Sequence, residues 1–361
     1  MAVSIGRCLP AGGADRGTVS PDPMDARTLL AWTPRRLPDG LAPAVAGLPV
    51  VEDVAEVIGG TAWLTGSSPA GFAIPVEVAA ADPTAYARFV GPDVRSMLAE
   101  VERGAALLGR TSAGLRRSGP GGRIRFSTGD VPVVGVAADE EVGASEVFVS
   151  RETAAAIGVS TPRHLLIGPA NGVERSTIVG ALEALLPAGT ALHTATHWEA
   201  PFLRYGHESL APALMKAAMG EFAARPHDDG SLEVDPAWAP EHIAAASVPI
   251  LGTVTCNRAL APQLAGALGD VADAGLAELV DPADYRGCYV PRFVGRNPAG
   301  SLSNHSWGAA VDLNASRNPF GQPPRMDPRV VAAFERWGFR WGGRWQIPDG
   351  MHFEFQRFPN I

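Results

Sequence analysis

Lysine is almost missing from this chain of 361 residues: Lys216 is the only one, and arginine supplies the other cationic side chains. Acidic residues outnumber basic ones, so the formal net charge is −8. The chain therefore lacks the basic surplus that binding to a nucleic-acid backbone requires. What remains is an ordinary globular composition, with 46% hydrophobic and 19% charged residues, which is enough to bury a core.

Long apolar runs are missing as well. No stretch approaches the roughly 20 apolar residues that a membrane-spanning helix needs. Residues 1–8 lack the apolar segment of a secretory signal peptide. From this stretch alone we expect either a cytoplasmic protein or a numbering that omits an upstream export segment.

Cysteine is scarce, with Cys8 in a head rich in glycine, proline and arginine, and Cys256 and Cys288 far downstream. If the protein is exported, the two downstream cysteines can form a disulfide. Two buried thiols are the alternative. The sequence leaves both possibilities open.

The length favours two domains. Residues 1–44 show no periodicity and are expected to be a flexible lead-in, followed by an α+β domain over 45–205. A polar, turn-rich stretch within 206–244 indicates a connecting segment. Residues 245–361 then form a second domain, which contains the residues that can carry chemistry.

The first domain shows alternating strand and helix patterns. Val51–Ile58 and Thr61–Leu64 are predicted to be a strand pair that turns at Gly59-Gly60. Proline at position 92 and apolar residues at three- and four-residue spacing predict a helix from Pro92 to Leu108.

Three segments of this domain, Gly-Arg-Ile-Arg-Phe, Val-Val-Gly-Val and Glu-Val-Phe-Val, give it a resemblance to the extracytoplasmic core domains of bacterial ABC-type permease proteins. The resemblance carries no catalytic residue. A strand-rich scaffold of another family is the alternative.

The second domain begins with a predicted strand over 249–252 and an amphipathic helix over 259–274. A further helix is predicted over 328–337. His305 and Asp312 are seven residues apart, which would place them on opposite faces of a straight strand. The chain must therefore turn between them, and Gly308 is placed to allow that turn.

The last strand presents His352 and Glu354 on one face and apolar residues on the other. Two imidazoles and one carboxylate, with an acid such as Asp349 beside them, are the side chains of a hydrolytic zinc site: three protein ligands, an open position for water and an acid/base. Because the ligands lie on strands instead of a helix, the pattern is not that of a zincin.

At these residues the chain resembles a known family. The motif is Ser303-x-His305-x-x-Gly308-x-Ala310-x-Asp312, followed by Asp349-x-x-His352. It is similar to that of the VanY-type D-alanyl-D-alanine carboxypeptidases and the related L-alanyl-D-glutamate endolysins, within the wider group of zinc peptidases with hedgehog-like folds. The resemblance covers residues 245–361.

The resemblance implies one Zn²⁺ per chain, bound by His305, Asp312 and His352, with Asp349 as catalytic acid/base. Many relatives carry glutamate at the position of Asp349, so Glu354 is a second candidate that could assist. Arg292 matches an upstream arginine that steadies the substrate carbonyl or carboxylate in such enzymes.

We therefore expect an α+β protein with a C-terminal zinc peptidase domain built on a small antiparallel sheet. Its expected substrates are peptidoglycan stem peptides, cleaved by D-alanyl-D-alanine carboxypeptidase action or by L-alanyl-D-glutamate endopeptidase action. Such substrates would place the protein outside the cytoplasmic membrane. A zinc fold that serves only as a binding or regulatory module is the alternative, and no protein partner of the first domain can be named.

Overall fold

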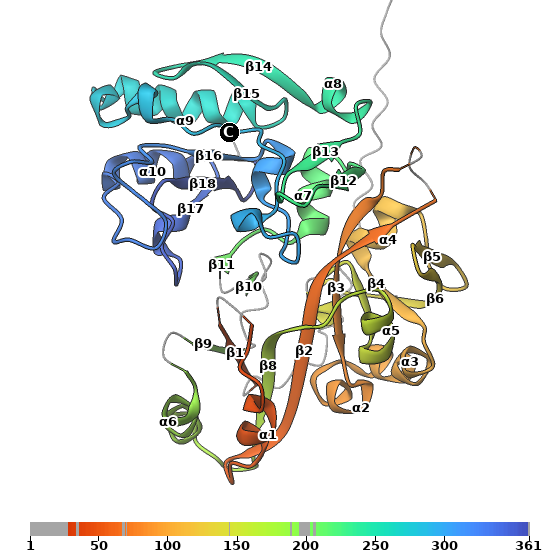
Figure 1. The fold of residues 1–361 in the computed structure, drawn as a ribbon. Coiled ribbons are helices and arrows are strands. Elements are labelled where there is room, and N and C mark those ends of the chain that lie inside the picture. The colour runs from red at the N-terminus through yellow and green to blue at the C-terminus, as the bar shows by residue number, and fades with distance from the viewer. Residues whose placement is uncertain are drawn as a thin grey trace, which may run out of the picture.

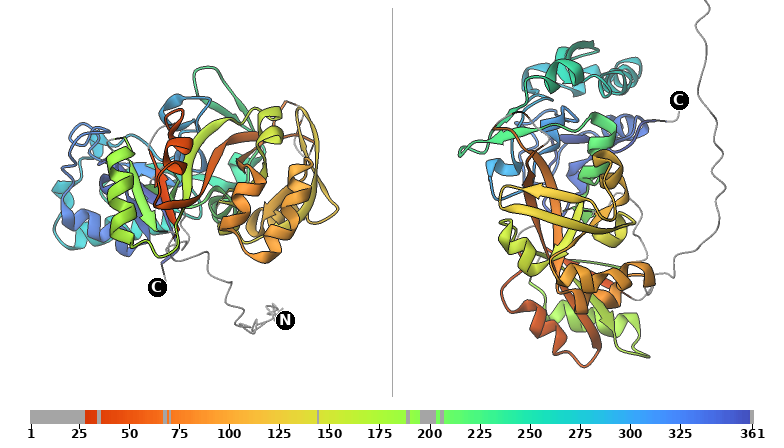
Figure 2. Two further views of the ribbon diagram at one scale, coloured as in Figure 1. Left: turned by 90° about the horizontal axis from the view of Figure 1, so that it is seen from below. Right: turned by 90° about the vertical axis from the view of Figure 1, so that its right-hand side faces the viewer.

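The computed structural model describes residues 28–359, with gaps at 34–35, 67–68, 70, 144, 188–189, 195–202 and 205–206. It is a mixed α+β fold in which one large sheet takes up the first half of the described chain. Several small sheets and their helices follow. Figure 1 and the right-hand view of Figure 2 show these later elements stacked on one end of the large sheet.

The large sheet has nine strands within the described residues, in the order β3-β7-β4-β6-β5-β2-β8-β1-β9. Its strands are β1 (Leu29–Trp32), β2 (Val51–Leu64), β3 (Ile74–Ala81), β4 (Ala106–Gly109), β5 (Arg123–Phe126), β6 (Gly129–Ala137), β7 (Val147–Ser150), β8 (Thr161–Pro169) and β9 (Ala191–Thr194).

Short helices connect these strands and cover the sheet. They are α1 (Leu41–Ala46), α2 (Pro83–Tyr86), α3 (Pro92–Glu102), α4 (Arg110–Arg116), α5 (Arg151–Ala156) and α6 (Arg175–Leu185). The side chain of Ser150 caps α5 by accepting a hydrogen bond from the backbone N–H of Thr153.

Two predictions for this half are wrong. Part of the expected lead-in, Leu29–Trp32, is a completely buried strand that pairs with β8 and with β9, because its four apolar side chains pack into the sheet cores. The helix expected to reach Leu108 ends at Glu102. Gly104, at φ 98°, breaks it, and the buried Leu107 and Leu108 then belong to strand β4.

The predicted turn at Gly59-Gly60 is also wrong, because β2 runs straight through both residues. A side chain would be crowded at Gly59, where a Cβ would lie 3.3 Å from both Arg163 Cγ and the carbonyl oxygen of Val78. A Cβ on Gly60 would lie in ordinary contact, 3.5 Å from a methyl group of Val159. Glycine inside a strand marks close approach here, not a turn.

The later half of the described chain contains four helices and nine short strands. The helices are α7 (Pro212–Met219), α8 (Trp238–His242), α9 (Ala261–Asp273) and α10 (Pro328–Arg336). The strands are β10 (Leu203–Arg204), β11 (His207–Glu208), β12 (Ala224–Pro226), β13 (Leu232–Val234), β14 (Ile243–Val248), β15 (Gly252–Asn257), β16 (Ala310–Asp312), β17 (Phe339–Trp341) and β18 (His352–Phe355).

The small antiparallel sheet expected here is present, with strand order β16-β18-β17. The helices predicted over 259–274 and 328–337 correspond to α9 and α10. Of the strand predicted over 249–252, residues 249–251 form instead the tight turn between β14 and β15, and Gly252 begins β15. Ile250 takes a left-handed conformation there, with φ 64°.

Residues 206–244, expected as a connecting segment, contribute directly to the core of the second half. Met215, Met219, Phe222 and Trp238 from this segment pack with residues of α9, α10 and β18 in one hydrophobic cluster. The stretch looked like a connector because its polar turns surround these few large apolar residues.

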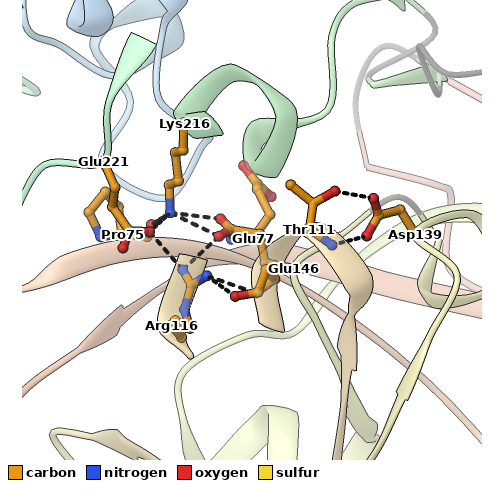
Figure 3. A network of polar contacts seen from close by, with 9 residues as sticks. Pro75, Glu77, Thr111, Arg116, Asp139, Glu146, Lys216 and Glu221 are labelled. Atoms are coloured by element: carbon orange, nitrogen blue, oxygen red, sulfur yellow. Dashed lines mark hydrogen bonds and ion pairs between the residues drawn. The ribbon is translucent and has the colours of Figure 1, made fainter. Parts of the chain in front are cut away.

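The two halves are joined by a buried group of charges, which we call the interface cluster: Arg116, Glu146, Lys216 and Glu221 (Figure 3). Lys216 Nζ, from α7, lies 2.9 Å from Glu146 Oε1 and also donates to the carbonyl of Pro75. Arg116 Nη2 lies 2.7 Å from Glu146 and 2.9 Å from Glu221. Burial alone would raise the pKa of Glu146, but Lys216 and Arg116 lower it, so its carboxylate stays charged.

Cys256 and Cys288 form a disulfide, which answers the question that the sequence left open. Both residues are buried in the core of the second half. Within the described part of the chain, none of the helices has the length and apolar character needed to cross a lipid bilayer.

Candidate metal centre

The first imidazole lies on a tight turn. The hydroxyl of Ser303 caps a 3₁₀ turn over Asn304–Trp307 by accepting from the backbone N–H of His305. Gly308 ends the turn in the left-handed conformation, at φ 62°, as its place between His305 and Asp312 predicted. A Cβ there would lie 2.7 Å from the backbone nitrogen of Asn257, so position 308 requires glycine.

Neighbouring backbone groups hold this turn and orient its histidine. Asn257, at the end of β15, donates from its side chain to the carbonyl of Trp307 and from its backbone to the carbonyl of Gly308. His305 Nδ1 lies 3.0 Å from the carbonyl oxygen of Cys288. A carbonyl only accepts, so Nδ1 carries a proton, and Nε2 is the ring nitrogen that remains for a metal ion.

The other two ligand candidates face each other across a strand pair. In the β16–β18 register, Asp312 is directly opposite His352. Asp312 Oδ1 lies 2.9 Å from His352 Nδ1, and Asp312 Oδ2 lies 3.2 Å from His305 Nε2. The carboxylate therefore bridges the two imidazoles.

Together His305, Asp312 and His352 form what we call the ligand cluster. One potential ligand atom from each lies within 4.8 Å of the others, and all three side chains are buried. Burial alone would raise the pKa of Asp312, but the imidazoles hold it well below its usual range. Burial would lower the pKa of His352, but Asp312 and Glu354 raise it well above its ordinary value.

Glu354 lies behind His352, on the ring edge that faces away from Asp312. Its Oε2 is 3.1 Å from His352 Nε2 and accepts from the side-chain amide of Asn304 at 2.7 Å. Burial raises the pKa of Glu354, but the hydrogen bonds from His352, Ser209 and Asn304 outweigh it and keep the pKa low. A carboxylate held in this way orients the ring and fixes its tautomer.

Asp349 and Arg292 lie beside the ligand cluster. Burial raises the pKa of Asp349, and one of its carboxylate oxygens is buried without a hydrogen-bond partner among the described residues. Burial lowers the pKa of Arg292, which interacts electrostatically with Asp312 and Asp349. Ser306 holds the backbone of Arg292 through two hydrogen bonds of 2.9 and 3.0 Å.

These groups share one pocket of about 270 Å³. Arg292, Asp349 and Glu354 line it together with the ligand cluster, and Trp345 lies 5.3 Å from His352, centroid to centroid. All six candidate site residues from the sequence therefore meet in one place.

The donor set fits a divalent metal ion such as zinc. Two imidazoles and one carboxylate are typical of a site with three protein ligands and one open position. His305 Nε2 is buried and makes no hydrogen bond within the described residues, although its other ring nitrogen is fixed. A metal ion would satisfy that nitrogen, and Nδ1 is the nitrogen of His352 that faces the cluster.

The sequence did not identify Asn257, Ser306 and Cys288 as residues that support the site. Asn257 and Ser306 act through hydrogen bonds to distant backbone groups, and Cys288 contributes a carbonyl oxygen, which every residue has. The only available signal was position: Ser306 lies within the ligand motif, and Cys288 lies four residues before Arg292.

Residues 296–355 match the family model described as D-alanyl-D-alanine carboxypeptidase. The match contains the whole ligand cluster as well as Asp349 and Glu354, and it supports a peptidase of this broad family without distinguishing its subfamilies. No curated protein matches the chain.

Among solved structures, the periplasmic region of MacB from Actinobacillus actinomycetemcomitans is similar to 50% of this chain, with 94% of that structure covered, 10% identity and a TM-score of 0.36. The extracellular domain of the ABC-type transporter YknZ from Gram-positive bacteria covers 46% of this chain and matches over its full length, with 12% identity and a TM-score of 0.34. Similarities this low support no inference, so the expected permease-like character of residues 45–205 stays a prediction.

Proposed function

We propose that this protein is a zinc-dependent peptidase that hydrolyses peptidoglycan stem peptides, acting as a D-alanyl-D-alanine carboxypeptidase outside the cytoplasmic membrane. The observation that carries the proposal is the meeting of the ligand cluster with Asp349 and Arg292 in one pocket, inside the segment that matches the family model. The buried disulfide agrees with an oxidising compartment. A hedgehog-like fold for the C-terminal sheet belongs to the same proposal.

His305, Asp312 and His352 would hold the ion, with His305 fixed by the Cys288 carbonyl and His352 fixed by Glu354. When bound, zinc lowers the pKa of a coordinated water to about 7 and polarises a substrate carbonyl. Proton transfer and binding of the substrate oxygen are then the tasks of the protein's own side chains.

Asp349 accepts the proton of the attacking water and delivers it to the leaving amine. Its raised pKa suits both steps, since a carboxyl group that holds its proton more tightly is a better base and can still act as an acid. Arg292 binds the substrate oxygen on which negative charge develops. Glu354 is a positioning residue in this mechanism, because its hydrogen bonds with His352, Ser209 and Asn304 hold it behind His352.

Replacing Asp349 by asparagine tests the proposal. We expect bound zinc to stay at one ion per chain while release of D-alanine from a stem pentapeptide falls by about 10²- to 10⁴-fold, the usual contribution of a general acid–base group. Asp228→Asn is the control, since Asp228 is exposed and does not line the pocket.

Four results would contradict parts of the proposal. Wild-type protein without bound metal would overturn it. Full activity in Asp349→Asn would remove the role of Asp349. Products whose masses correspond to cleavage between L-alanine and D-glutamate would show endopeptidase action in place of carboxypeptidase action. A zinc-loaded wild type that cleaves no stem peptide would favour a binding module.

A further inference from the structure

The disulfide between Cys256 and Cys288 adjoins the turn that carries the first metal-ligand candidate. The two cysteines are 0% and 1% exposed and lie 32 residues apart in the chain. The match with the family model begins at residue 296, so neither cysteine belongs to the matched segment. The similarity to known peptidases therefore assigns no role to this disulfide.

The segment around Cys288 holds His305 itself. The carbonyl oxygen of Cys288 lies 3.0 Å from His305 Nδ1 and accepts its proton in a hydrogen bond. Two residues further on, the backbone N–H of Val290 donates to the carbonyl of His305 at 3.0 Å. The ring and the backbone of this ligand are thus both fixed from one segment, so a shift of that segment changes where Nε2 points.

The segment around Cys256 holds the other end of the same turn. Asn257, the next residue in β15, donates from its backbone to the carbonyl of Gly308 and from its side chain to the carbonyl of Trp307, both at 3.0 Å. The approach is close, because a Cβ at Gly308 would lie 3.1 Å from the carbonyl carbon of Cys256. The end of the turn is therefore packed directly against β15.

The disulfide is the covalent link between these two segments. The backbone N–H of Tyr289 also joins them, by donating to the carbonyl of Thr255 at 3.1 Å. Cys288 Sγ lies 3.2 Å from the carbonyl oxygen of Gly308. A disulfide sulfur carries no hydrogen, so this last contact is one of packing. Breaking the link leaves weaker, non-covalent contacts to keep both ends of the turn in place.

His305 is the member of the ligand cluster that depends most on such support. Asp312 and His352 face each other across the β16–β18 ladder, whose backbone hydrogen bonds set their relation. His305 lies outside that ladder, on the 3₁₀ turn. Groups that orient a metal ligand are typically worth 10- to 100-fold in metal affinity. The disulfide can therefore act on the metal through one ligand without touching it.

We propose that the Cys256–Cys288 disulfide positions His305 for metal binding, so that the chain gains its full zinc affinity only when these two thiols have been oxidised. This inference rests on the metal site of the proposed function. Forming the bond passes two electrons and two protons from the thiols to an oxidant of the disulfide class, which is reduced to two thiols. The chain binds zinc weakly in a reducing compartment, and oxidation completes the site.

The test measures zinc affinity by competition with a chromophoric chelator, which needs no turnover. The double variant Cys256→Ala with Cys288→Ala is expected to bind zinc about 10- to 100-fold more weakly than the wild type. Alanine is chosen because a free thiol is itself a zinc ligand. Cys8→Ala is the matched control, since it leaves the disulfide intact and should keep the wild-type affinity.

Two further variants separate positioning from a general loss of stability. Asn257→Ala keeps the disulfide but removes the side-chain bond to Trp307, and zinc affinity should fall by about 10-fold. Leu268→Ala removes buried apolar volume from α9 in the same core and should lower the melting temperature while zinc affinity of the folded protein stays constant. If the double variant does not fold, Asn257→Ala and wild type reduced with a phosphine carry the test.

The outcomes distinguish this inference from the proposed function. A double variant with wild-type zinc affinity, or an equal fall of affinity in Leu268→Ala, would overturn the inference and leave the proposed function standing. Weak zinc binding in the double variant, beside a wild type that binds zinc tightly but cleaves no stem peptide, would sustain the inference and overturn the proposed function. A wild type that binds no zinc would overturn both.

Discussion

The protein buries two groups of charged side chains, and the charges of the two groups are balanced in different ways. The interface cluster pairs Lys216 and Arg116 with Glu146 and Glu221, so two basic side chains meet two carboxylates. In the ligand cluster one carboxylate, Asp312, lies between two imidazoles, which are cationic only when protonated.

The difference separates a structural from a chemical use of buried charge. The interface cluster pairs each of its charged side chains with one of opposite charge from the protein itself. The ligand cluster balances Asp312 only with protons or with a divalent cation, and the same imidazole nitrogens can accept either. Breaking each cluster should therefore affect different properties of the protein.

The largest effect is expected from Asp312→Asn. Loss of the anionic ligand should abolish zinc binding and lower peptide hydrolysis by at least about 10³-fold, because the ion would both activate the water and polarise the substrate carbonyl. Metal analysis of the dialysed protein and product release measure the two effects. Asp273→Asn, an exposed acid at the end of α9, is the control, and a zinc-replete Asp312→Asn would show that the ligand cluster is not the metal site.

The second largest effect is expected from Lys216→Met, which should lower the free energy of unfolding without changing zinc binding. Removing one partner of a buried ion pair costs about 3–5 kcal/mol, and here Glu146 and Glu221 would be left to share Arg116 as their cation in the cluster. Urea unfolding measures this loss of stability, and zinc content should stay at one ion per chain.

Two further variants sharpen the result. Arg151→Met breaks the exposed pair with Glu56 and should cost at most about 1 kcal/mol. The double variant Lys216→Met with Glu146→Leu should recover part of the lost stability, because it also removes the carboxylate that lost Lys216 as its partner. If Lys216→Met were as stable as the wild type, the interface cluster would contribute nothing to the joining of the halves.

The smallest effect is expected from Glu354→Gln. Loss of the carboxylate behind His352 should weaken zinc affinity by about 10- to 100-fold, the usual effect of a partner that orients a ligand, while kcat at saturating zinc changes little. Competition with a chromophoric chelator measures the affinity, and Glu278→Gln, an exposed site, is the control. A fall in kcat with unchanged zinc affinity would instead support the proton-transfer role that the sequence allowed.

The site was more predictable than the fold around it. His305, Gly308 and Asp312 lie within ten residues of each other, so the turn and its glycine follow from local geometry. The alternation of His352 with Phe353 fixed the polar face of the last strand. In the first half, Gly59 was assigned to a turn and Gly104 was not recognised as the end of a helix, because glycine occurs in turns, at helix ends and at close approaches alike.

The sequence by itself determined which residues are the candidate ligands, the turn between His305 and Asp312, and the acid that precedes His352, since each depends on residue type and short spacing. Only the tertiary structure decided that Glu354 stands behind His352, that Lys216 joins the two halves and that the disulfide adjoins the turn of His305. These contacts span from 2 to 70 residues in the chain, and they depend on strand register and on which distant segments meet. Those features are set by packing, which no local pattern encodes.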